Sequence, residues 1–206
     1  VQRNNSELVA GWGNLVNRTA SMVAKNFGEI PQPGELEEVD RAVLARVAGA
    51  FAEVGGLLQR HRQKAALGEV MRVVGDVNKY VTDTEPFRLK GDDQRERLAT
   101  VLHTLTQCVS DCNLLLAPFL PHAANRVDAV LGGDGQFVPM PHVADVEDLD
   151  GGPGYPVITG DYSGFPRWEP TPVTVGTAIA KPSPVFVKLD PEEVVATERA
   201  AMSGEG

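Results

Sequence analysis

Residues 35–60 read ELEEVDRAVLARVAGAFAEVGGLLQR, and their apolar side chains recur every three or four positions. This spacing places apolar side chains on one face of an α-helix. Acidic residues are concentrated at its start, where they suit the positive end of a helix dipole. The stretch therefore predicts a long helix whose apolar face must be covered by other helices. The apolar positions are Leu36, Val39, Val43, Val47, Phe51, Val54 and Leu58.

The segments on either side show the same periodicity, with glycine and proline mostly confined to the joints between them. Gly28 follows one segment, and Pro118 breaks another. Pro86 ends a third, because a proline biases the residue before it out of the helical region. Long helices joined by short connections, without an alternating strand pattern, pack antiparallel. The predicted fold is therefore all-α, an antiparallel helix bundle. Its further helices are expected over 5–27, 64–81, 92–117 and 122–131.

The composition changes at about residue 133. The last 74 residues hold ten of the fifteen prolines, together with many glycines and short mixed stretches. Such a composition predicts an irregular or extended tail, with a flexible turn at 151–154. A short helix from Pro191 to about Met202 is expected to end it. We therefore expect two parts, a helical bundle over 1–132 and, over 133–206, an irregular tail with a terminal helix.

The composition as a whole is that of an ordinary globular chain. Hydrophobic residues make up 42% of the 206 residues and charged residues 23%, close to typical usage. No stretch approaches the roughly 18 unbroken apolar residues of a membrane span, and no signal peptide opens the chain. We expect a cytoplasmic protein with no membrane partner. The chain begins with Val1 rather than Met, which suggests a fragment.

The net charge of −9 argues against a nucleic-acid partner when taken as an average, because phosphate contacts need basic residues. The charge is unevenly distributed, however. Residues 60–90 hold seven basic and four acidic residues, whereas the tail over 134–206 holds four basic and twelve acidic residues. Helical segments at 1–32 and 60–90 can therefore still present a mildly basic face, although simple solvation of polar faces is the alternative.

Metal and catalytic sites find little support in the sequence. His103, Cys108 and Cys112 share one predicted helix, but His103 lies about 140° around the helix from Cys108, and no fourth ligand completes a tetrahedral site. The two cysteines are therefore predicted to be core thiols. No nucleophile elbow, phosphate-binding glycine loop or zinc-protease motif is present. We expect no catalytic residue and no metal, and an enzymatic use of these three residues is disfavoured.

The first helix carries a more informative pattern. Measured around it from Leu8, four polar side chains fall between about 220° and 280°, away from the apolar stripe. They combine an amide, a guanidinium, a hydroxyl and an ammonium group, which can read base edges and hold phosphates. A solvated helix face is the alternative. This polar ridge consists of Asn14, Arg18, Ser21 and Lys25.

A second informative segment is 78–87, which reads NKYVTDTEPF. Pro86 fixes the exit from a helix and leaves the ring of Phe87 at a joint between two helices. There the ring can either close the end of the bundle or stack on an unpaired base.

In this order and spacing, the two segments resemble the C-terminal anticodon-binding domain of the methionyl-tRNA synthetase family, which belongs to the class I aminoacyl-tRNA synthetases. The matching blocks are Gly13 to Arg18, Phe27, Asn78 with Tyr80, and Glu85 to Phe87. Segments 116–121, 176–182 and 184–190 are also similar to that family. The resemblance covers essentially the whole chain.

The resemblance implies recognition of the CAU anticodon of methionine tRNAs. Asn14 and Arg18 match family residues that hydrogen-bond anticodon base edges. Pro86 and Phe87 match residues that flank the first anticodon base, although the family usually has Trp where this chain has Phe87. Stacking of an aromatic ring on a base contributes about 1–3 kcal/mol.

The resemblance also implies a parent enzyme, an ATP-dependent methionine–tRNA ligase. Its catalytic domain and that domain's HIGH-type and KMSKS-type motifs are absent here, so this chain alone is expected to be inactive, with no metal or cofactor of its own. The expected partners are methionine tRNA and the missing catalytic domain, against which the tail would pack as a strut. The alternative is a helical protein-interaction module that does not bind RNA.

Overall fold

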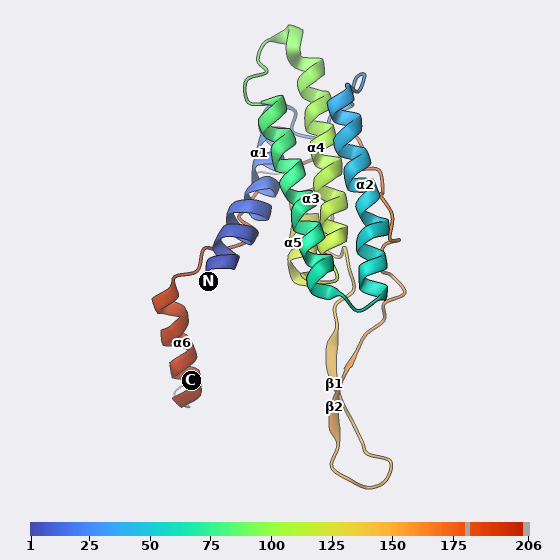
Figure 1. Ribbon diagram of the computed structural model, residues 1–206, viewed down its shortest axis with the longest axis vertical. Coiled ribbons are helices and arrows are strands. Elements are labelled where there is room, and N and C mark those ends of the chain that lie inside the picture. The colour runs from blue at the N-terminus through green and yellow to red at the C-terminus, as the bar shows by residue number, and fades with distance from the viewer. Residues whose placement is uncertain (180–181, 204–206) are drawn as a thin grey trace.

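A bundle of helices forms most of the computed structural model, which describes residues 1–179 and 182–203 (Figure 1). The predicted helical bundle is confirmed, and neighbouring long helices run antiparallel. A two-stranded hairpin and a terminal helix project from the bundle. The elements are η1 (Asn4–Gly13), α1 (Asn14–Asn26), α2 (Glu38–Gln59), α3 (Gln63–Thr84), η2 (Asp92–Gln94), α4 (Arg95–Leu116), α5 (Pro121–Val130), β1 (His142–Val146), β2 (Tyr155–Thr159) and α6 (Pro191–Ser203).

Helix α4 lies at the centre of the bundle and packs against α1, α2, α3 and α5. Its residues are apolar or small around most of its circumference, as is typical of a fully buried helix. Cys108 and Cys112 are fully buried core thiols, as predicted, and burial raises the pKa of both. Helix α2 has the length and composition of a membrane span, but here its buried residues pack against α3 and α4.

Helix boundaries differ from the sequence-based ones at two places that matter. The helix predicted from residue 35 begins at Glu38, because the side chain of Asp40 accepts a hydrogen bond of 2.8 Å from the Glu37 N–H and caps the first turn. The helix predicted to end near Val81 continues to Thr84 and stops at Glu85, which adopts the left-handed conformation.

The first predicted helix is continuous but changes its geometry along its length. Its first part, η1, is a π-helix, and regular α-geometry starts at Asn14. The assumed rotation of 100° per residue therefore holds only from Asn14 onward, which includes the whole polar ridge. Long π-helical stretches are rare, and π-geometry often marks functional sites.

The tail contains a hairpin that the sequence did not predict. Strands β1 and β2 pair antiparallel, with His142 opposite Thr159 and Val146 opposite Tyr155. Both strands are exposed at nearly every position, so no alternation of apolar and polar residues marks them. The expected turn at 151–154 lies in the loop between the strands, where Gly151 has a φ of 80°.

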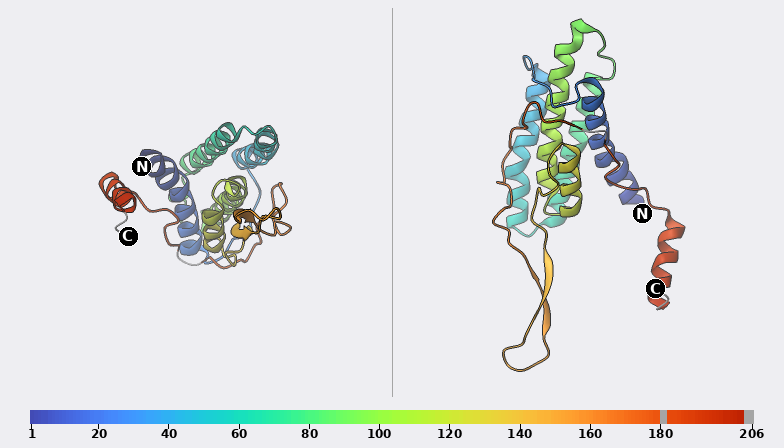
Figure 2. Two further views of the ribbon diagram at one scale, coloured as in Figure 1. Left: turned by 90° about the horizontal axis from the view of Figure 1, so that it is seen from below. Right: turned by 180° about the vertical axis from the view of Figure 1, so that it is seen from behind.

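The rest of the tail returns along the bundle. The indole N–H of Trp168 donates to the Phe51 carbonyl at 2.9 Å, and the two rings meet edge to face at 5.5 Å. Farther on, Ile30 N–H donates to Thr177 O at 2.9 Å, which holds the tail beside the end of α1. Helix α6, predicted correctly, lies apart from the bundle (Figure 2). Ala180 and Lys181, within the family-like segment 176–182, lie outside the described residues.

Candidate nucleic-acid interface

The polar ridge lies on the outer face of α1. Asn14, Ser21 and Lys25 are exposed and Arg18 is half-buried, whereas Leu15 and its neighbours on the opposite face are buried in the core. The apolar stripe fixes the orientation of the helix, and the ridge follows on the other side by helical periodicity. Asn14 and Arg18 are one turn apart and so present their side chains on the same face.

The start of the ridge depends on Gly13. A Cβ at this position would lie 3.0 Å from the Leu8 carbonyl and 3.1 Å from the Phe186 ring. The absence of a side chain therefore allows the returning tail to pack against the first turn of α1. A small cavity of about 180 Å³ remains there, lined by Asn14 and Asn17 together with tail residues including Phe186.

The cations of the ridge have no acidic partner. Among the described residues, neither Arg18 nor Lys25 forms an ion pair, whereas Arg3 pairs with Glu7 and Lys79 with Asp83. A guanidinium group that is half-buried and unpaired retains its full capacity to donate hydrogen bonds. Arg18 is thus available for a ligand with acceptor oxygens or ring nitrogens.

The second predicted segment forms a tight turn at the end of α3. Glu85, with a φ of 41°, accepts a hydrogen bond of 2.8 Å from the Arg88 N–H, so Pro86 and Phe87 occupy the centre of the turn. Pro86 is buried, and Phe87 is 50% exposed. Non-glycine residues with positive φ are costly and cluster at functional sites. Because Phe87 is half exposed, the turn holds this aromatic ring in solvent rather than using it to close the end of the bundle.

A buried network that the sequence analysis missed supports this end of the bundle. Asp40 of α2 accepts hydrogen bonds from Arg97 of α4 at 2.9 Å and from the Tyr80 hydroxyl of α3 at 2.5 Å. Burial opposes ionisation of Asp40, but these bonds hold its pKa below the ordinary value. Burial, with the hydrogen bond to Asp40, raises the pKa of Tyr80. The network fixes α3 about one turn before the helix ends at Thr84.

The ridge and the turn lie toward the same end of the bundle. The segment 85–91 lies beside the end of α1 in both views (Figures 1 and 2). Arg95, which follows this segment, stacks over the Phe27 ring at 4.6 Å and so joins the end of α1 to the start of α4. Arg18 lies about 12 Å along the helix from Asn26. No hydrogen bond, ion pair or cation–π contact joins Arg18 to Phe87 within the described residues.

This arrangement combines hydrogen-bond donors with an exposed ring, which is the chemistry that proteins use to bind unpaired bases. His103, in contrast, is used structurally, because its Nδ1 lies 3.0 Å from the Pro31 carbonyl. Burial lowers the pKa of His103.

No family model matches the chain. The chain is 61% identical over 194 residues to a methionine–tRNA ligase of Nocardioides and 54% identical over 206 residues to that of Salinispora tropica. These matches cover 94% and 99% of the chain, but 32% and 34% of the two relatives.

Solved structures of methionyl-tRNA synthetases also match the chain. The apo methionyl-tRNA synthetase of Mycobacterium tuberculosis superposes with a TM-score of 0.72 at 27% identity, over 92% of this chain and 34% of that one. The same enzyme in complex with methionyl-adenylate gives a TM-score of 0.71. Over the third of their length that it spans, the chain is therefore similar to methionyl-tRNA synthetases in both sequence and fold.

Proposed function

We propose that this chain is the tRNA-binding part of a methionine–tRNA ligase and that it recognises the CAU anticodon. In this proposal Asn14 and Arg18 hydrogen-bond the base edges, and Pro86 and Phe87 hold and stack the first anticodon base. The observation that carries it is the unpaired Arg18 on an exposed polar ridge. The half-exposed Phe87 lies toward the same end of the bundle.

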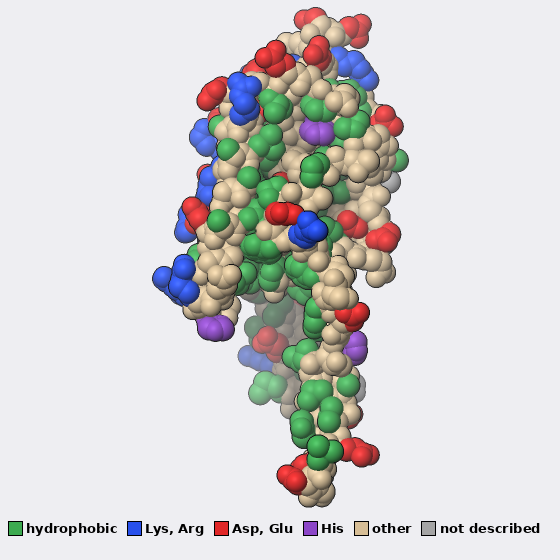
Figure 3. Space-filling view, turned by 90° about the vertical axis from the view of Figure 1, so that its right-hand side faces the viewer, with side chains coloured by type: hydrophobic (Ala, Val, Ile, Leu, Met, Phe, Trp, Pro, Cys, Tyr) green, Lys and Arg blue, Asp and Glu red, His purple; other side chains and the backbone are tan. Residues whose placement is uncertain are grey.

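The remaining two thirds of such a ligase would supply ATP binding and the transfer of methionine to tRNA. The hairpin supports a contact with that part, because six large apolar side chains on it and just after it are exposed (Figure 3). Exposed apolar side chains in such numbers mark interaction sites; here they lie on both faces of the hairpin, because the pairing places Val143 beside Ile158 on one face and Val146 beside Tyr155 on the other. We propose that the hairpin packs on the rest of the ligase, whose relatives are about three times as long. The exposed residues are Val143, Val146, Leu149, Tyr155, Ile158 and Tyr162.

The proposed function is tested by binding of this chain to methionine tRNA and to a copy with one changed anticodon base. Arg18→Ala removes a base contact worth about 1–3 kcal/mol, so we expect the preference for CAU to fall by roughly 5- to 150-fold. Arg126→Ala, which removes another exposed and unpaired arginine from α5, is the matched control. Equal discrimination by Arg18→Ala and Arg126→Ala would exclude Arg18 from the site.

The same titration tests the alternative function, a helical module that binds only protein. RNA binding weakens steeply as salt is raised, because counterions are released from the phosphates. An absence of tRNA binding at low salt would leave the apolar hairpin as the functional surface and would favour that alternative.

A further inference from the structure

The turn between α2 and α3, together with the first residues of α3, carries three cations that have no acidic partner in the described part of the chain. Arg60, Arg62 and Lys64 lie within five residues and are exposed. None of them forms an ion pair within the described part of the chain, whereas Arg88 pairs with Glu85 at the other end of α3. We call these three residues the basic turn. Like charges held this close repel one another unless an anion lies between them.

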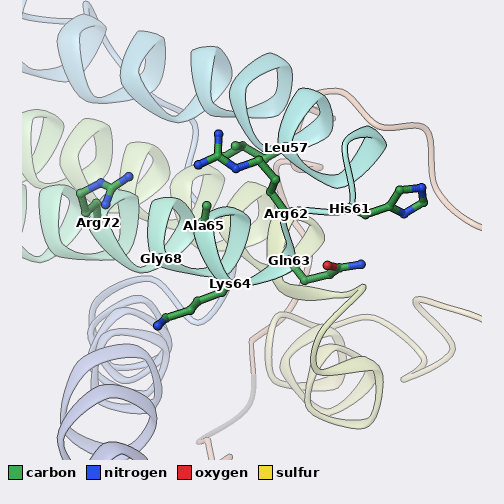
Figure 4. Close-up of a pocket in the computed structure, with 8 residues that line it drawn as sticks. All are labelled: Leu57, His61, Arg62, Gln63, Lys64, Ala65, Gly68 and Arg72. Atoms are coloured by element: carbon green, nitrogen blue, oxygen red, sulfur yellow. The ribbon is translucent and has the colours of Figure 1, made fainter.

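The basic turn borders an open groove of about 720 Å³ (Figure 4). Arg62 and Arg72 rise on one side of α3, with the small residues Ala65 and Gly68 between them. A Cβ at Gly68 would meet nothing within 4 Å, so the floor of the groove is open. The lining contains no acidic side chain. The residues that line the groove are Leu57, His61, Arg62, Gln63, Lys64, Ala65, Gly68 and Arg72.

Two cations of the groove also line a second cavity, toward the start of the chain. A second cavity of about 300 Å³ lies between η1 and α3, and Lys64 and Arg72 line both cavities. Arg3 also lines the second cavity, but so does Glu7, with which Arg3 forms an ion pair of 2.9 Å. Glu69 lies close by but is nearly buried and is engaged by Arg46 at 2.6 Å and by Arg72. The cationic surface without acidic lining is therefore the groove of about 720 Å³ itself, on a chain whose net charge is −9.

Several cations along an open groove suit a ligand that carries regularly spaced anionic oxygens. Guanidinium groups donate in pairs to phosphate oxygens, and lysine adds a point charge. The backbone of a nucleic acid presents such phosphates at regular intervals. A single small anion would leave most of this groove empty.

The basic turn lies at the end of α3 opposite to Phe87. Helix α3 has 22 residues and is therefore about 33 Å long. No single nucleotide spans this distance, but a folded RNA that places unpaired bases at Phe87 can reach the basic turn with a base-paired stem. A-form stems are bound through phosphates and 2′-hydroxyls rather than through base sequence.

We propose that the basic turn binds backbone phosphates in a base-paired stem of the same tRNA whose anticodon lies at the polar ridge. The inference rests on the proposed function for the identity of the RNA. The basic turn then contributes affinity without sequence preference, and the polar ridge distinguishes between anticodons.

The test compares two triple variants of the full 206-residue chain by tRNA binding at several salt concentrations. The first variant replaces Arg60, Arg62 and Lys64 by alanine. The control replaces Arg126, Arg167 and Lys188, which are exposed residues elsewhere on the chain, and so removes the same charge. Circular dichroism checks that both variants are folded. We expect the first variant to lose at least about tenfold in affinity and to lower the slope of log K against log salt by about 2 to 3.

The ratio between CAU and altered anticodons should stay constant in the first variant, whereas Arg18→Ala should change that ratio and lower the slope by less than about 1. Equal slopes for the two triple variants would overturn the phosphate site even if anticodon discrimination is present. Loss of discrimination in the first variant would also overturn it. A wild-type chain that does not distinguish anticodons would contradict the proposed function instead, and the slopes would still decide the role of the basic turn.

Discussion

Replacing Asp111 by asparagine should change how the stability of the chain depends on pH. Asp111 is a buried residue of α4 that accepts hydrogen bonds from the Gln107 side chain at 2.9 Å and from the Thr171 N–H at 3.3 Å. It thereby fastens the returning tail to the centre of the bundle. Burial raises the pKa of Asp111 from 3.8 to about 6.

The direction of this pH dependence follows from the number of protons that the folded and unfolded chains bind. Between pH 3.8 and about 6 the folded chain binds a proton at Asp111 that the unfolded chain releases, so the free energy of unfolding falls as pH rises through this range. With these two pKa values, the loss between about pH 4.5 and about pH 7.5 is about 2 kcal/mol. Asparagine keeps the shape of the side chain and does not ionise. Relative to wild type, the free energy of unfolding of Asp111→Asn should therefore rise by about 2 kcal/mol between these two pH values.

Urea unfolding of both proteins at the two pH values measures this gain. Other groups also titrate, because burial raises the pKa of Asp128 and lowers that of His103. Their contributions are common to both proteins and cancel in the difference. Asp145→Asn, which replaces an exposed carboxyl of β1, is the matched control. A difference between Asp111→Asn and wild type that is the same at both pH values would refute the reasoning.

Two further predictions concern the support of the candidate interface. Asp40→Ala leaves the Arg97 guanidinium and the Tyr80 hydroxyl without their shared acceptor, and it should lower the free energy of unfolding by about 3 kcal/mol in urea titrations; a loss below about 1 kcal/mol would show that the network contributes little. Glu85→Gly removes a left-handed non-glycine residue at a φ of 41° and should raise stability by about 1 kcal/mol. A lower melting temperature for Glu85→Gly would contradict the assumed strain.

Periodicity was sufficient to predict the bundle and the exposed face of α1. The apolar stripe that includes Leu15 and Val23 is buried, and the polar ridge therefore had to lie on the outside. The exposure of Phe87 could not be predicted in the same way. Whether a ring after Pro86 closes the bundle or faces solvent depends on the turn geometry, which Glu85 sets by adopting a conformation that its residue type does not favour.

Contacts between distant residues explain what the sequence did not show. Asp40 meets Tyr80 and Arg97 across 40 and 57 residues, and no local pattern marks such partners. Ion pairs are not visible in the sequence either. The composition shows that residues 60–90 are basic, but it does not show that Arg62 is unpaired whereas Arg88 has a partner. The hairpin was missed because side chains such as Val143 and Ile158 are exposed on it, so burial imposes no alternation.

The net charge of −9 does not oppose the RNA binding proposed for the polar ridge, because the position of the charges matters more than their sum. The hairpin and the loop between its strands carry Asp145, Glu147, Asp148 and Asp150. They extend from the end of the bundle opposite to the segment 85–91 (Figure 1). At physiological ionic strength exposed charges are largely screened beyond about 8 Å. Bases proposed to lie at Arg18 would therefore respond to the unpaired cations beside it. The acidic hairpin projects from the same end of the bundle as the basic turn (Figure 1), so it would act on the stem proposed there, and at low salt it should slow association rather than alter discrimination between anticodons.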